Sequence, residues 1–185
     1  MRSHHFPLGS LAALSLLIGC DQSSPVSPSG ASSADIPMAA SAGSRPWKES
    51  YHSIGTITAD ARCSAPLLLE SYRGGGTATH TGKYDIVNSH CLDPATGALT
   101  NGTFVKTVAN GDQLFGTYVG SASVIQPPTP VAIFAITGTL TFTGGTGRFT
   151  GAAGTTTMSG TEQADFSQTP IATQDELTMV GEISY

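Results

Sequence analysis

Apolar and polar residues alternate along two stretches in the second half of the chain. From Ala132 to Phe142 every second residue except Gly138 is apolar, and threonines stand between the later ones. From Leu177 to Tyr185 every second residue except Gly181 is again apolar, with threonine, glutamate or serine at most of the positions between. A period of two is what a strand with one buried face requires, so both stretches are predicted strands.

Turn-forming residues divide the rest of the chain into pieces of strand length, and no convincing helical period follows residue 20. This spacing is typical of a β-sandwich or a β-barrel. Only 11% of the residues are charged, and a weakly charged β-domain is prone to edge pairing, so closure of the sheet would be useful in the all-β domain that we expect. The expected strands cover residues 51–61, 65–72, 78–89, 98–109, 112–122, 131–142, 155–165 and 176–185.

The segment 109–112 contains the dipeptide Asn110-Gly111 between two of these strands. This dipeptide favours a two-residue type I′ turn, because both central residues of that turn need positive φ. Counting outward from such a turn fixes a register. The predicted pairs are Thr107 with Leu114, Val105 with Gly116 and Thr103 with Tyr118, with Val108, Phe104 and Phe115 on the other face.

A glycine-rich segment, residues 144–154, connects the sixth and seventh predicted strands. It does not match the spacing of a phosphate-binding loop, and no helix is expected after it. We therefore predict a compact turn in which Gly144, Gly145 and Gly147 accept unusual backbone angles, Phe149 plugs one end of the barrel and Arg148 stays at the rim.

An apolar segment near the N-terminus ends in Leu17-Ile18-Gly19-Cys20, which resembles the cleavage and lipidation site of a bacterial lipoprotein. The apolar run is too short for a membrane-spanning helix, so residues 1–19 are a predicted signal peptide. Cys20 would then carry the acyl chains of a membrane anchor, and the Ser, Ala and Pro-rich residues 20–46 would form a disordered linker before a barrel domain over 47–185. An ordinary secretory signal is the alternative. The prediction is an exported protein anchored to the bacterial envelope, with the choice of membrane open.

Lipidation of Cys20 leaves Cys63 and Cys91 as a pair, and an oxidising compartment favours a disulfide between them. The alternatives are two reduced thiols, or a metal site with His80 and His90. Neither C-x-x-C nor H-x-x-x-H occurs, so no metal is expected. No cofactor motif is present either.

The charge of the chain bears on its partners. The net charge is −5 and the isoelectric point is about 5.3, so no basic surface is expected to attract phosphates, and nucleic acid is excluded as a partner.

Three residues are weak candidates for acid–base chemistry. His80, Tyr84 and His90 fall in one predicted strand and its exit, and alternation places them on the same face. The simpler interpretation is that they line a polar surface or the barrel mouth without chemistry.

Residues 110–114, with Gly116 or Gly120, and the later segment 144–149, with Gly151 and Gly154, are similar to a motif pair of the allene oxide cyclase and dirigent barrel superfamily, especially its bacterial members. The similarity covers about residues 75–185. It implies an eight-stranded antiparallel barrel, often oligomeric, whose interior can hold a small apolar ligand. Plant members cyclise an allene oxide or direct phenoxy-radical coupling, but their catalytic residues have no matching positions in this chain, so the implication is confined to the fold.

Three hypotheses for function follow. The barrel could bind a small hydrophobic ligand, act as a cyclase or isomerase, or serve as a structural or interaction module with a filled interior. An open cavity with convergent polar groups would favour binding or catalysis, and a carboxylate with a strongly shifted pKa inside it would favour the enzyme.

Overall fold

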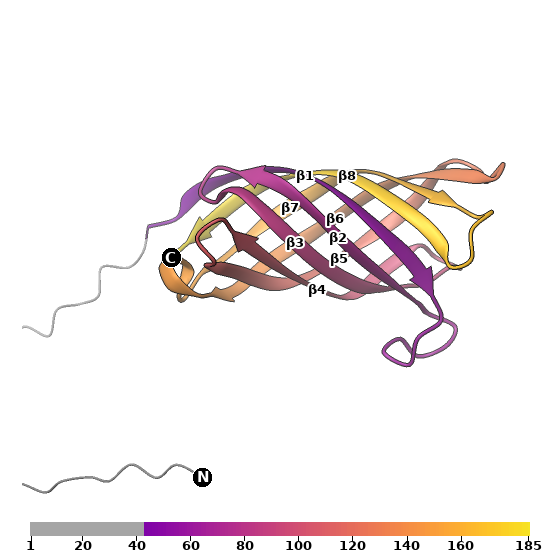
Figure 1. Ribbon diagram of the computed structural model, residues 1–185, viewed down its shortest axis with the longest axis horizontal. Coiled ribbons are helices and arrows are strands. Elements are labelled where there is room, and N and C mark those ends of the chain that lie inside the picture. The colour runs from indigo at the N-terminus through magenta and orange to yellow at the C-terminus, as the bar shows by residue number, and fades with distance from the viewer. Residues whose placement is uncertain (1–42) are drawn as a thin grey trace, which may run out of the picture. The chain divides into compact units, whose positions relative to one another are not determined.

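The computed structural model describes residues 43–185, which form a closed barrel of eight antiparallel strands (Figure 1). The predicted fold class is confirmed. The strands are β1 Arg45–Thr58, β2 Leu68–Ala78, β3 Gly82–Leu92, β4 Ala98–Val108, β5 Gln113–Gln126, β6 Val131–Gly145, β7 Ala153–Asp165 and β8 Ile171–Ser184, with a 3-10 turn at Gly147–Phe149.

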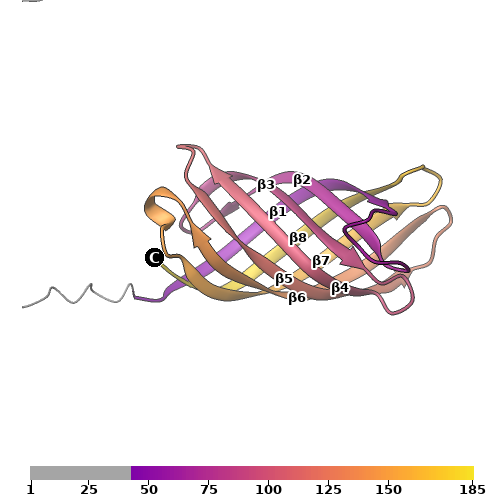
Figure 2. The same ribbon diagram turned by 90° about the horizontal axis from the view of Figure 1, so that it is seen from below.

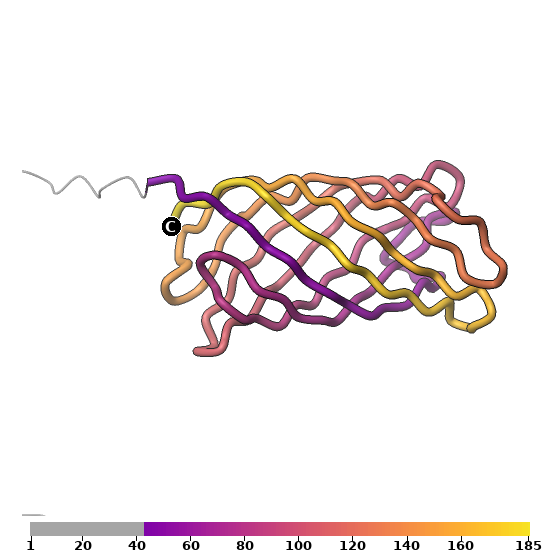
Figure 3. Tube along the Cα trace, turned by 90° about the horizontal axis from the view of Figure 1, so that it is seen from above, coloured from indigo at the N-terminus to yellow at the C-terminus, as the bar shows by residue number. Residues whose placement is uncertain are grey.

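The barrel closes because its first and last strands pair. β1 and β8 are antiparallel neighbours over thirteen residue pairs, from Arg45 opposite Ile183 to Ile57 opposite Ile171, and Figure 3 shows the two strands side by side. Each described strand therefore has a partner on both sides, which removes the unpaired edges that a weakly charged sheet would expose.

The two ends of the barrel differ. The end with loops 59–67, 93–97, 127–130 and 166–170 is called the open end, and the opposite end, with turns 79–81, 109–112 and 146–152, is called the plugged end. At the plugged end Phe149 is fully buried against Tyr185, with ring centroids 5.1 Å apart, while the Arg148 side chain is about half exposed. Figure 2 shows this turn, in orange, beside the C-terminus. The predicted plug and rim positions are confirmed.

The predicted register of the β4–β5 hairpin is wrong by one residue. Thr107 lies opposite Gln113, and Val105 lies opposite Phe115. The loop has three residues rather than two: the N–H of Val108 donates to Asp112 O at 3.0 Å, and Gly111, at φ 87°, makes the left-handed step. This is the form in which a three-residue hairpin loop closes with glycine at its last position.

The side chain of Asp112 explains why the loop takes this longer form. Its carboxylate accepts hydrogen bonds from Asn110 Nδ2 at 2.9 Å and from the backbone N–H of Arg148 at 3.3 Å. Asp112 thereby joins the hairpin to the glycine-rich turn. The one-residue change of register places Leu114, Gly116 and Tyr118 on the inner face of the barrel, together with Phe104 and Val108.

Several strands begin earlier or end later than the sequence predicts. β1 begins at Arg45 rather than Tyr51, and β8 begins at Ile171 rather than Glu176. The segments missing from the predicted strands contain two charged residues that face inward, Glu49 and Asp175. A search for alternating apolar residues does not detect such positions.

Cys63 and Cys91 form a disulfide with a Cα–Cα distance of 5.6 Å, which confirms the predicted bond. It joins the β1–β2 loop to β3, and the two cysteines pack with Leu67 and Leu69 in a small cluster separate from the main core.

We expect the double variant Cys63→Ala/Cys91→Ala to lose about 3 kcal/mol of unfolding free energy, because the bond closes a loop with a sequence separation of 28. Urea unfolding measures the difference. The reduced wild-type protein should match the variant, and a variant as stable as the oxidised wild type would contradict the expectation.

Cys20, the predicted signal peptide 1–19 and residues 20–42 of the predicted linker lie outside the described residues. Within residues 43–185, no helix has the length and apolar character needed to cross a bilayer.

Candidate functional site

The open end of the barrel holds a cavity of about 440 Å³. Its walls are mostly apolar and come from six strands, with the loop 93–97 and Phe166 at the entrance. The strand residues on the walls are Ile57, Leu68, Leu92, Ala122, Ser123, Val124, Phe134 and Ile171. A concave, mostly apolar space of this size is the usual form of a small-molecule site.

The bottom of this cavity is acidic. Glu70 and Glu162 both line it, although each is at most 5% exposed. Strand register adds a partner to each: His90 lies opposite Glu70 across β2 and β3, and Asp175 lies opposite Glu162 across β7 and β8. These four residues are called the polar floor. Within residues 43–185, no group of three such side chains has the arrangement of a metal site.

Two tyrosines connect the members of the polar floor. The hydroxyl of Tyr72 lies 2.5 Å from Glu162 Oε2 and 3.1 Å from Glu70 Oε2, so it is shared between the two carboxylates. His90 Nε2 lies 2.5 Å from Glu70 Oε2, and His90 Nδ1 lies 2.9 Å from the Tyr118 hydroxyl. Burial raises the pKa of both tyrosines, so their phenols stay neutral and can donate.

The other two carboxyl groups hold protons more strongly than usual. Burial, with the negative charge of Glu70 as the next cause, raises the pKa of Glu162 to about 9 and that of Asp175 to about 7. Ser53 opposes part of the shift at Asp175, since its hydroxyl donates to Asp175 Oδ2 at 3.2 Å. The pair therefore retains a proton near neutral pH, as closely placed carboxyls do.

A second buried ionic cluster lies deeper in the barrel. Lys106 Nζ lies 2.6 Å from Glu49 Oε1, and both side chains are fully buried. Glu49 also accepts from Trp47 Nε1 at 2.8 Å and from the Tyr84 hydroxyl. These hydrogen bonds satisfy the carboxylate, and none of the four residues lines the cavity at the open end. We interpret this cluster as structural.

The structure separates the three residues considered for acid–base chemistry. His80 lies in the β2–β3 turn at the plugged end, with Nε2 2.9 Å from Pro46 O. Tyr84 belongs to the cluster around Glu49, and His90 belongs to the polar floor. The expected common face holds for Tyr84 and His90, which both point into the barrel, but β3 begins only at Gly82, so His80 is not part of it.

Sequence reasoning missed most of the site, namely Glu70, Tyr72, Tyr118, Glu162 and Asp175. A usable indication existed for two of them. Asp175 has the same parity as the buried Leu177 and Met179 in β8, and Glu162 has the same parity as the buried Met158 in β7. Period-two alternation places both carboxylates inside the barrel.

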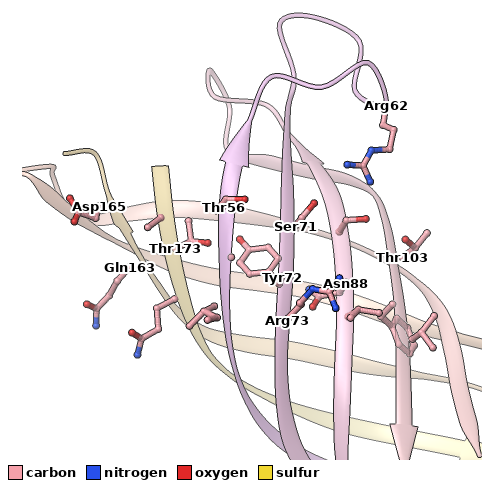
Figure 4. Close-up of a pocket in the computed structure, with 18 of the residues that line it drawn as sticks. Thr56, Arg62, Ser71, Tyr72, Arg73, Asn88, Thr103, Gln163, Asp165 and Thr173 are labelled. Carbon is pink, nitrogen blue, oxygen red and sulfur yellow. The ribbon is translucent and has the colours of Figure 1, made fainter. Parts of the chain in front are cut away.

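A further hollow lies over the wall of the barrel beneath the β1–β2 loop. Figure 4 shows Arg62 in this loop and Arg73 below it on β2. Ile54 and Val87, which also line the hollow, are 61% and 42% exposed. Arg62 is held by Asp60, with Nε 3.0 Å from Oδ1. Because this hollow is open to solvent, it offers less of an enclosed site than the cavity at the open end.

Comparison of the chain with models of known protein families, with curated proteins and with solved structures finds no match.

Proposed function

We propose that this protein binds a small, largely apolar molecule in the cavity at the open end of the barrel. The observation that carries the proposal is the combination of apolar walls with a buried polar floor at one end only. The plugged end is filled by Trp47, Phe142 and Phe149, so a ligand has one route of entry.

The proposal includes the location of the protein. The lipoprotein-like sequence around Cys20 supports an acylated form anchored to the bacterial envelope. Mass spectrometry of the N-terminal peptide from membrane-extracted protein tests this part, because an unmodified Cys20 would contradict it.

Binding is tested with N-phenyl-1-naphthylamine, a neutral apolar dye whose fluorescence rises in apolar surroundings. We expect saturable binding with one site per chain. Ala122→Trp fills the mouth and should weaken binding by at least about tenfold, because the indole takes the volume the dye needs. Val180→Trp, on the outer wall where Val180 is 56% exposed, is the matched control and should bind normally. Absence of saturable binding, or equal binding by Ala122→Trp, would contradict the proposal.

Acid–base catalysis is the second candidate function. The observation that favours it is the raised pKa of Glu162, which lines the cavity, and of its cross-strand neighbour Asp175, which together give one proton donor and one acceptor in the neutral range. Binding remains the better supported function, since structural networks also shift pKa values. Small molecules extracted with the protein can be incubated with it in D₂O. A gain of mass with wild type and none with Glu162→Gln would indicate proton transfer.

A further inference from the structure

We propose that the ligand carries a cationic head, most simply an alkylammonium group, which contacts the polar floor while its apolar part fills the cavity. This inference rests on the proposed function and specifies the chemical class of the molecule that is bound.

The charges of the polar floor are the first argument. It contains three carboxyl groups, Glu70, Glu162 and Asp175, and one basic residue, His90. Among residues 43–185, His90 is the only basic side chain within ion-pair distance of any of the three. The other buried base, Lys106, is committed to Glu49. The polar floor therefore has an excess of acids over bases.

The hydrogen bonding of the polar floor is an independent argument. Glu70 lines the cavity, and its buried Oε1 has no hydrogen-bond partner among the described residues. The Glu70 residue is 1% exposed. A carboxylate oxygen accepts hydrogen bonds, so what this atom lacks is a donor. A buried acceptor without a donor costs free energy, which a bound donor would recover.

The lining of the cavity indicates what kind of molecule can bring a hydrogen-bond donor to the polar floor. Glu70 and Glu162 face the same space as the apolar residues Leu68, Phe134 and Ile171. A molecule that packs against the apolar walls and also donates hydrogen bonds to the polar floor has a hydrocarbon or aromatic body and a compact head rich in N–H donors. An ammonium group offers three donors and a positive charge, whereas a fatty acid would place a fourth carboxylate beside the existing three.

Competition against the fluorescent dye tests the inference with three probes of equal chain length: octylammonium, 1-octanol and octanoate. The measurement is made at pH 7.5 on the full chain, where an alkylammonium group with a pKa of about 10 is charged. We expect octylammonium to displace the dye at a concentration at least about tenfold lower than octanol, because hydrogen bonds to charged groups are the stronger ones. Octanoate should be weaker than octanol.

Two variants separate recognition of charge from a change in the cavity. Glu70→Gln should lose most of the preference for octylammonium over octanol, a ratio that is measured within the same variant. Glu176→Gln changes the same type of side chain at an exposed position on the outer face of β8, and it should keep the preference. A cooperative urea unfolding transition shows that Glu70→Gln is folded.

The outcomes for the two proposals are distinct. If the dye does not bind, the proposed function is wrong. If the dye binds but octylammonium displaces it no better than octanol, or if Glu70→Gln retains the full preference, the inference about the cationic head is wrong and the proposed function stands.

Discussion

Raising the pH from 5 to 8 is expected to destabilise this protein by several kcal/mol. Asp175 and Glu162 have folded-state pKa values raised to about 7 and about 9, well above those of exposed carboxyls in an unfolded chain. Between about pH 4 and these values the folded protein holds more protons than the unfolded chain. Stability therefore falls as the pH rises, by up to about 1.4 kcal/mol per pH unit for each group.

Urea unfolding at pH 5, 6, 7 and 8 measures this slope. The double variant Glu162→Gln/Asp175→Asn should show a much flatter dependence, because neither side chain can then titrate. The matched double variant Glu176→Gln/Glu182→Gln, which alters two exposed carboxyls of β8, should retain the wild-type slope. Stability that is constant or rises over this range in the wild type would contradict the structural account.

The second large effect concerns the buried lysine. Lys106→Met is expected to cost about 3 to 5 kcal/mol, because it leaves the buried carboxylate of Glu49 without its cation. Lys106 Nζ also lies 5.1 to 5.6 Å from the ring centroids of four aromatic residues, so the cation has favourable neighbours that methionine does not replace. Urea or thermal unfolding measures the loss.

A double-mutant comparison isolates the charge. Adding Glu49→Gln to Lys106→Met removes the unpaired carboxylate, and the glutamine oxygen can still accept the hydrogen bond from Trp47 while its amide N–H can donate to the Tyr84 hydroxyl. The double variant should therefore be more stable than Lys106→Met alone. Lys83→Met, at an exposed position of β3, is the matched control and should change stability by less than about 0.5 kcal/mol. A Lys106→Met protein as stable as this control would contradict the assignment.

Much of the fold could be predicted because the outer face of this barrel is polar and most of the inner face is apolar. The alternation from Ala132 to Phe142 and the plug at Phe149 depend on local pattern alone, and both are found in the structure. The register of the β4–β5 hairpin could not be obtained in this way. It depends on Asp112 contacting Arg148, which is 36 residues away in the sequence.

The site was harder to predict than the fold because its residues break the alternation of apolar and polar positions. Glu70, Glu162 and Asp175 occupy inner positions where a search for apolar residues expects none. Each is stabilised by partners on other strands, such as Ser53 on β1 for Asp175. Such partners can be identified only once the register of the strands is known. From the sequence alone, a charged residue that points into the barrel is therefore easily assigned to a turn or to the exposed face of a strand.

The pairing of β1 with β8 has a consequence for the order of the strands along the chain. Arg45 and Ile183 are direct neighbours across that pair, so a short peptide could join the two termini of the barrel without disturbing it. New termini could then be placed in the loop 127–130, between β5 and β6. Circular permutation would leave each strand its present neighbours, which means that the barrel is specified by which strands are adjacent and not by which strand is synthesised first.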